Sequence, residues 1–256
     1  LVYAQLFLIL PGLSAFVIVM SHKDYKDAQY VAPTYRAFGQ AANFMFGCIL
    51  LPVCKHSSIF RLAGMSYERQ IPFHAMAGLL CVIFSTVHFA GIYVAYKDTQ
   101  FGRGFVTAWS NQKKVNLAGL ISWSIMAAMM IIAIFLRRKF FGFFRTTHFA
   151  FVLVIIFACI HHPPVAVTMI PGLVLYTIDL FVLRIMGMVQ TKPEIKSLKY
   201  HEAAGVTEVE LHFKNPDKFS YEGGQFIQMD LGTGLMHPIS IAWYNKAEGV
   251  ASFFIK

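Results

Sequence analysis

The sequence predicts a bundle of six membrane-spanning helices followed by the start of a β-rich soluble domain. Of the 256 residues, 57% are hydrophobic and 14% are charged, and about a quarter charged is usual for soluble domains. The apolar residues are gathered in long blocks, and about 20 apolar residues are enough for one helix to span the hydrocarbon core. After residue 189 the sequence becomes polar and alternating, which is typical of strands.

We expect each apolar block to form one membrane span. The blocks cover residues 1–20, 37–54, 71–96, 115–136, 147–161 and 165–189. The first block begins at Leu1, inside an apolar run, so we expect the natural chain to begin earlier. The cysteines form no CxxC pair and lie in or beside these blocks, which predicts buried thiols and no disulfide or zinc framework. They are Cys48, Cys54, Cys81 and Cys159.

Residues 190–256 are expected to form part of a β-domain. Residues 206–213 (VTEVELHF) alternate between apolar and polar side chains, and Gly223 and Gly224 predict a turn. Further short runs of strand type follow at 225–231, 238–243 and 251–255. This region is too short for a complete cofactor-binding module, so we expect the chain to be cut at this end as well.

The net charge of +9 indicates membrane topology and not nucleic-acid binding. Basic residues concentrate in the short segments 55–69 and 137–145. The positive-inside rule places both in the cytoplasm, and the β-domain then shares that side. The opposite loop, 97–114, is also basic, through Lys97, Arg103, Lys113 and Lys114. These features predict a multi-pass integral membrane protein that is surrounded by lipid. The membrane is the plasma membrane or an organelle membrane.

Five of the ten histidines lie in or at the edges of apolar blocks: His74, His88, His148, His161 and His162. Ionisable residues inside a membrane are costly and by default indicate function. His74 and His88 are 14 residues apart. At about 100° and 1.5 Å per residue they share nearly one helix face, about 21 Å apart along the axis. His148 and the adjacent pair His161 and His162 repeat this spacing on the fifth block.

Both blocks begin on the same side of the membrane, so His74 is level with His148, and His88 with His161 or His162. Two facing imidazoles at two depths predict two bis-histidine haems stacked along the membrane normal. Histidines that only hydrogen-bond between helices would not explain two matched pairs, and zinc lacks the Cys or carboxylate ligands it prefers. A straight helix favours His162 as the fourth ligand, whereas His161 requires a distorted one.

These positions resemble the ferric reductase and NADPH oxidase superfamily. Residues 73–93 (FHAMAGLLCVIFSTVHFAGIY) resemble its first haem helix. Residues 115–122 (VNLAGLIS), the basic run 137–139 and residues 144–149 (FRTTHF) are most similar to plant-type ferric-chelate reductases. The run HPIS, 237–240, resembles the HPF(S/T) flavin motif, and Ile255 with Lys256 resembles the strand that follows it.

The resemblance implies a six-helix ferric reductase-like transmembrane domain at residues 1–189 and, at 190–256, the start of a β-barrel FAD-binding domain, with the NAD(P)H-binding domain absent. It implies two b-type haems, FAD and NAD(P)H as cofactors. For the fourth haem ligand it favours the 13-residue spacing, and so His161. The implied metal ligands are His74, His88, His148 and His161. The implied flavin-binding residues are His237, Pro238, Ile239, Ser240 and Lys256.

The function that the resemblance implies is an oxidoreductase that passes electrons from cytoplasmic NAD(P)H, through FAD and the haems, to an acceptor across the membrane. The basic loop 97–114 favours anionic ferric chelates as the acceptor, through electrostatic steering. Reduction of O2 to superoxide is the alternative, and a cytochrome b subunit of a larger complex is another. Arg103 and Arg145 are expected partners of haem propionates. Such an oxidoreductase could also bind an accessory membrane subunit or form a homo-oligomer.

Overall fold

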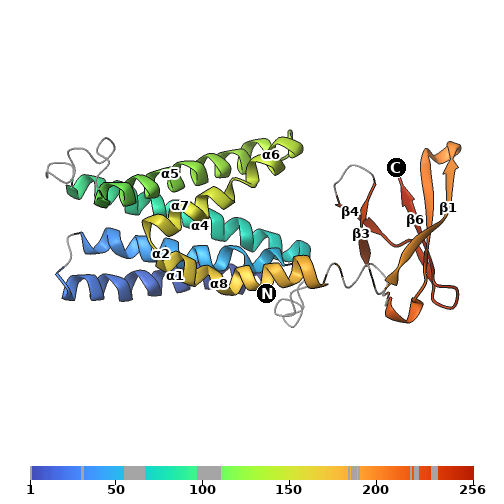
Figure 1. The fold of residues 1–256 in the computed structure, drawn as a ribbon, viewed down its shortest axis with the longest axis horizontal. Coiled ribbons are helices and arrows are strands. Elements are labelled where there is room, and N and C mark those ends of the chain that lie inside the picture. Colours follow the sequence, from blue (N-terminus) through green and yellow to red (C-terminus); the bar gives the residue numbers. More distant parts are fainter. Residues whose placement is uncertain are drawn as a thin grey trace. The chain divides into compact units, whose positions relative to one another are not determined.

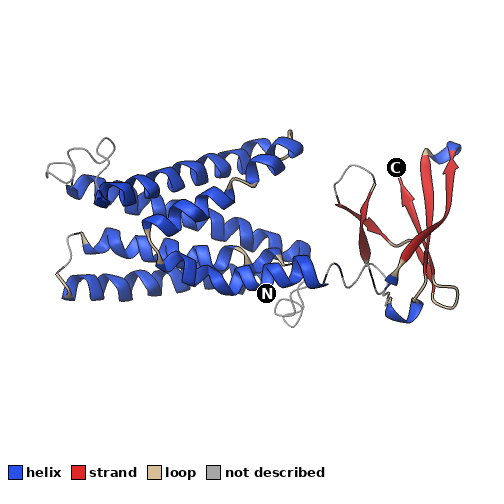
Figure 2. Ribbon diagram, in the orientation of Figure 1, coloured by secondary structure: helices blue, strands red, loops and turns tan. Residues whose placement is uncertain are grey.

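The computed structural model describes residues 2–29, 32–54, 67–96, 111–183, 185, 189, 191–219, 221, 225–231 and 236–256. The chain separates into two compact units, Leu1–Asp179 and Leu180–Lys256. The first unit is built from helices and the second from strands (Figures 1 and 2). The predicted domain boundary between residues 189 and 190 stays a prediction.

The helical unit follows the order of the apolar blocks. Proline stands at the start of α2 and α8, where its fixed φ suits the first turn and its missing N–H is not needed. The elements are α1 (Val2–Asp27), α2 (Pro33–Ile49), η1 (Leu51–Val53), α4 (Tyr67–Tyr96), α5 (Asn111–Ile131) with the π-turn η2 (Ile132–Leu136), α6 (Phe141–His148), α7 (Phe151–His161) and α8 (Pro164–Thr177) with the π-turn η3 (Ile178–Leu183).

Within the described part of the chain, three helical segments are long and apolar enough to cross a membrane: Gln70–Ala95, Val115–Leu136 and Phe141–His161. They correspond to the third, fourth and fifth predicted spans. Large apolar side chains point outward from them, and Phe135, for example, is 73% exposed. Such a surface suits lipid. The first, second and sixth blocks are also helical, and the count of six spans stays a prediction.

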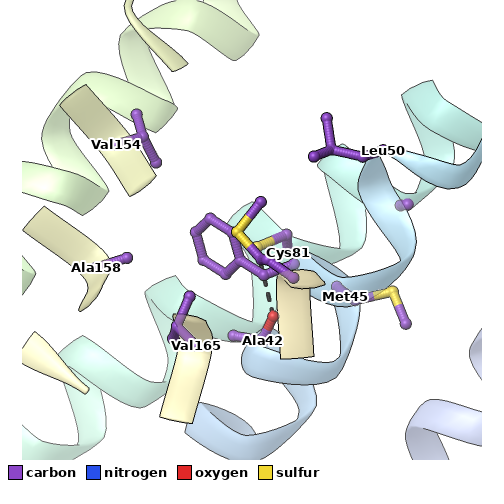
Figure 3. Packing of buried hydrophobic residues seen from close by; sticks show 10 residues of the cluster. Ala42, Met45, Leu50, Cys81, Val154, Ala158 and Val165 are labelled. Atoms are coloured by element: carbon purple, nitrogen blue, oxygen red, sulfur yellow. Dashed lines mark hydrogen bonds between the residues drawn. The ribbon is translucent and has the colours of Figure 1, made fainter. Parts of the chain in front are cut away.

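Small residues on α2 let the neighbouring helices approach closely. Ala37 and Ala41 are fully buried, and the Cys81 thiol of α4 donates to the Ala42 carbonyl at 3.7 Å (Figure 3). Small side chains and polar contacts of this kind hold membrane helices together, because lipid supplies no hydrophobic driving force. The core cluster draws on α2, α4, α7 and α8: Ala42, Met45, Phe46, Leu50, Ala77, Cys81, Val154, Ala158, Val165 and Met169.

The fifth span begins earlier than predicted and is not a straight helix. It starts at Phe141, α6 ends at His148, and α7 begins only at Phe151. Between them the Ala150 N–H donates to the Thr147 carbonyl at 3.0 Å, a bond from residue i to i−3. A turn closed in this way rotates about 120° per residue, against about 100° in an α-helix. The assumption of a straight helix is therefore wrong at this point.

The strand unit holds a four-stranded antiparallel sheet in the order β1-β2-β6-β5 and a two-stranded sheet, β3-β4. The described strands form these two sheets and no closed barrel. Their bounds are β1 (Pro193–His201), β2 (Val206–Phe213), β3 (Phe226–Asp230), β4 (Met236–Ser240), β5 (Trp243–Asn245) and β6 (Val250–Ile255).

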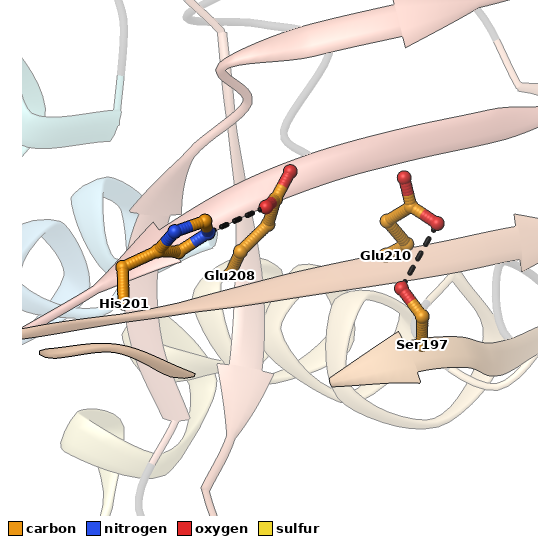
Figure 4. Close-up of polar contacts among 4 residues, drawn as sticks. All are labelled: Ser197, His201, Glu208 and Glu210. Atoms are coloured by element: carbon orange, nitrogen blue, oxygen red, sulfur yellow. Dashed lines mark hydrogen bonds and ion pairs between the residues drawn. The ribbon is translucent and has the colours of Figure 1, made fainter. Parts of the chain in front are cut away.

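The alternation predicted at residues 206–213 is confirmed in β2. Its apolar residues Val209, Leu211 and Phe213 are buried and join Phe253 of β6 in one core. The opposite face carries polar pairs between β1 and β2 (Figure 4). His201 lies 2.8 Å from Glu208, and Ser197 donates to Glu210 at 2.9 Å.

Candidate functional site

Four of the membrane histidines form two facing pairs. The ring centroids of His74 and His148 lie 6.0 Å apart, and those of His88 and His161 lie 6.2 Å apart. Two metal–imidazole bonds of about 2.0 Å each, with the half-widths of the two rings, place such centroids about 6 Å apart. Each pair therefore has the separation needed to hold one metal ion between its rings. The pairing also shows that α4 runs parallel to the α6–α7 segment, as predicted.

Three of these histidines hydrogen-bond to a backbone carbonyl of a neighbouring helix. The Nδ1 atom of His74 lies 2.8 Å from the Ile49 oxygen. His88 Nδ1 lies 2.7 Å from the Tyr35 oxygen, and His161 Nδ1 lies 2.9 Å from the Val115 oxygen. A carbonyl oxygen only accepts, so the proton sits on Nδ1 and the Nε2 lone pair is left for a metal.

The accepting carbonyls are open to the histidines for two different reasons. Ile49 is the last residue of α2, where carbonyls have no partner within the helix. Tyr35 is the third residue of α2 and Val115 the fifth of α5, and they are followed four residues later by Gly39 and Gly119. A Cβ on Gly39 would lie 2.9 Å from His88 Nδ1, and one on Gly119 would lie 2.7 Å from His161 Nδ1.

Side chains four residues apart lie above one another on a helix, so any side chain at Gly39 or Gly119 would block the approach of the imidazole. Sequence reasoning missed both glycines. A glycine inside an apolar helix that neighbours a histidine-bearing helix could have indicated such a close approach. The sequence does not say which carbonyl accepts the hydrogen bond.

His148 differs from the other three histidines. Its Nδ1 atom is buried and has no hydrogen-bond partner within the described part of the chain. Its ring lies against that of Phe144, with centroids 5.1 Å apart. Aromatic packing, without a backbone hydrogen bond, therefore orients this imidazole.

A cavity of about 620 Å³ lies beside His88 and His161. This volume is within the range of about 300–1,000 Å³ that is usual for small-molecule and cofactor sites. Phe89 and Trp123 form one wall as stacked rings 5.1 Å apart, and Trp123 Nε1 donates to the Thr86 hydroxyl at 2.9 Å. The facing imidazoles, the two glycines and the cavity together fit a planar metalloporphyrin with two axial histidines.

The structure brings His161, and not His162, opposite His88. The tight turn between α6 and α7 rotates the chain further per residue than an α-helix does, which is the direction of change that a 13-residue spacing needs. His162 lies just beyond the end of α7, with an extended backbone (φ −144°, ψ 91°) ahead of Pro163, as expected of a residue that precedes proline. The assignment of the four histidines as metal ligands stays a prediction.

The predicted flavin-binding run lies in β4, in the extended conformation that the sequence suggested. Pro238 and Ser240 are exposed, whereas His237 and Ile239 alternate with them and are half-buried. Lys256 is exposed directly after β6. Arg145 is exposed on α6, and Arg103 lies outside the described residues, together with residues 97–110 of the basic loop.

A family model described as "Ferric reductase like transmembrane component" matches residues 38–159. The matched stretch contains His74, His88 and His148. Residues 38–159 are a ferric reductase-type transmembrane domain. The resemblance to the ferric reductase and NADPH oxidase superfamily is thus confirmed, and with the three long apolar helices it shows an integral membrane protein.

Relatives of two kinds match this chain. Dual oxidase 2 of Sus scrofa is 27% identical over 243 residues, which cover 80% of this chain and 15% of the relative. Ferric reduction oxidase 2 of Arabidopsis thaliana is 25% identical over 221 residues, 82% of this chain and 29% of the relative. Ferric reduction oxidase 4 of the same plant is 32% identical over 167 residues, 62% of this chain and 23% of the relative. The chain thus spans less than a third of each of these relatives.

Proposed function

We propose that this chain is the electron-transferring part of a transmembrane oxidoreductase. The complete protein takes electrons from cytoplasmic NAD(P)H and passes them, through FAD and two b-type haems, to ferric chelates across the membrane. The proposal rests on the two pairs of facing histidines. The ring centroids of His74 and His148 lie 6.0 Å apart, and those of His88 and His161 lie 6.2 Å apart. A bound haem supplies reversible one-electron transfer, and the protein supplies ligation, orientation and dielectric.

The four histidines would act as axial ligands through Nε2. His74 and His148 hold the haem nearer the cytoplasm, and His88 and His161 hold the outer one. Hydrogen bonds from Nδ1 fix the tautomer and the ring orientation of His74, His88 and His161. A metal held between the two imidazoles of a pair would be covered by protein on both sides, which would leave the acceptor to take its electron elsewhere than at the metal.

The exposed face of β4 would meet the flavin. His237, Pro238, Ile239 and Ser240 are extended, which suits a strand that lies along a planar ring, and the Ser240 hydroxyl is exposed for hydrogen bonding. Lys256 would contact the pyrophosphate as a point charge. In this proposal the strand unit lies in the cytoplasm, and the membrane is the plasma membrane or an organelle membrane.

Ferric chelates are the acceptor that we favour, because several relatives carry the name ferric reduction oxidase and the loop 97–114 is basic. The dual oxidase relative, which matches 80% of the chain, favours O2 as the second candidate. Purified full-length protein with NADPH separates the two. We expect the rate of ferric-citrate reduction to be well above the rate of superoxide formation. Rapid superoxide formation with negligible ferric-citrate reduction would instead identify O2 as the acceptor.

Flavin analysis of the same preparation tests the remaining alternative. We expect one flavin per chain. A native protein without flavin would instead indicate a cytochrome b subunit that receives its electrons from another protein.

A further inference from the structure

His162 has no role as a haem ligand in the proposed function, yet it lines the same cavity as His88 and His161. Its Nε2 atom is buried and has no hydrogen-bond partner among the described residues. Buried polar atoms in proteins nearly always have a partner. The position therefore calls for a polar group that occupies the cavity.

The end of α7 explains why two consecutive histidines line one cavity. In a regular helix their side chains would diverge by about 100°. Pro163 and Pro164 disfavour the helical conformation in the residue before them, and His162 is extended, with φ −144° and ψ 91°. The chain thus leaves the helix immediately after His161, and His162 stays at the cavity.

The character of the cavity wall indicates the charge of that group. Among the described residues that line the cavity there is no Asp or Glu, while Arg36 supplies a cation and Gln40 and Asn116 supply amides. A wall rich in donors and free of carboxylates suits an anionic ligand group, because hydrogen bonds to a carboxylate are stronger than those between neutral groups.

We propose that His162 donates a hydrogen bond from Nε2 to a propionate carboxylate of the haem held by His88 and His161. The inference rests on the proposed function, since it needs that haem. His162 is then a positioning residue: it leaves the axial ligands unchanged and fixes the rotation of the porphyrin between them. The two adjacent histidines thus have different roles: His161 binds the metal, and His162 binds a propionate at the edge of the porphyrin.

The test measures how fast haem leaves the full-length protein and passes to apomyoglobin. We expect H162F to accelerate the loss of one of the two haems about tenfold, the effect of losing a hydrogen bond to a charged group, and H162Q, which keeps an N–H donor, to restore most of the retention. The Soret and low-spin signatures should stay as in the wild type. H212F, which changes a half-buried histidine of the strand unit, is the matched control and should have no effect.

Protein reconstituted with iron protoporphyrin dimethyl ester supplies the second arm. The ester carbonyl still accepts a hydrogen bond but carries no negative charge, so the difference in loss rate between the wild type and H162F should be much smaller for the ester than for the free acid. Faster loss of the free acid and the ester alike would make the role of His162 merely structural and overturn the proposal. Unchanged haem loss with a raised KM for ferric citrate would assign the bond to a carboxylate of the acceptor, and loss of the low-spin signature would make His162 a ligand. Absence of haem from the wild type would overturn the proposed function itself.

Discussion

His88 and His161 face each other with ring centroids 6.2 Å apart, and both are anchored in the same way. Each donates from Nδ1 to a carbonyl that precedes a glycine by four residues: Tyr35 ahead of Gly39 on α2, and Val115 ahead of Gly119 on α5. Two different helix pairs, α2 with α4 and α5 with α7, thus orient the two rings from opposite sides. Imidazoles held in this way would be preorganised to bind a metal.

The glycines are the first place to test this arrangement. In G39A or G119A the new methyl group would lie 2.9 Å or 2.7 Å from an imidazole nitrogen, so the ring must move and its hydrogen bond must break. We expect either variant to lose the outer haem and to keep the inner one, as measured by haem content per chain.

G142A and G12A are the matched controls, because no atom beyond the local backbone of the same helix lies within 4 Å of a Cβ built at either position. Alanine is also the better helix former, by about 1 kcal/mol. Both controls should therefore retain two haems. Equal haem loss in all four variants would show that the close approach to the histidines has no special role.

Ligand identity makes a separate prediction for the adjacent histidines. H161A should leave one haem per chain, because His161 faces His88, and H162A should be isolated with two. Haem quantification on purified protein reads the difference directly. If H162A were the variant that lost a haem and H161A kept both, the assignment from the structure would be reversed.

The missing hydrogen bond at His148 predicts that the two haems are held unequally. Removing the hydrogen-bond partner of a metal ligand typically costs about 10–100-fold in metal affinity, and His148 Nδ1 has no such partner in the described part of the chain. The inner haem, isolated in H161A, should therefore dissociate faster than the outer haem, isolated in H74A. Transfer to apomyoglobin gives both rates, and slower loss of the inner haem would contradict the account.

Neighbouring phenylalanines of β6 offer a matched test of the strand unit. Phe253 is fully buried, and Phe254 is 54% exposed. F253A should destabilise this unit by about 3–5 kcal/mol, because it leaves a cavity in the core, and F254A should cost far less. Proteolytic susceptibility of the strand unit in full-length protein, measured against urea, reports the difference. Similar losses for both variants would place the core elsewhere.

Local patterns in the sequence predicted much of this architecture. Blocks of apolar residues predicted the long helices, alternation predicted β2, and the 14-residue spacing of His74 and His88 predicted their shared face. The choice between His161 and His162 depends on the turn at Phe149 and Ala150, where neither Gly nor Pro marks a break. β1 was not predicted as a separate strand, since its apolar residues do not alternate regularly across the register shift between Ile195 and Ser197.

The anchoring carbonyls of Ile49, Tyr35 and Val115 could not be predicted from the sequence at all. Every residue carries a carbonyl, and only the packing of α2 against α4 and of α5 against α7 determines which of them meets a histidine. The glycines were visible in the sequence, but their purpose becomes clear only once these contacts are known.

A reduced-minus-oxidised spectrum of the purified full-length protein, with haem quantified per chain, would show whether the facing histidine pairs hold two haems. We expect two low-spin b-type haems per chain, both six-coordinate. One haem per chain, or none, would show that the two histidine pairs do not each hold a haem.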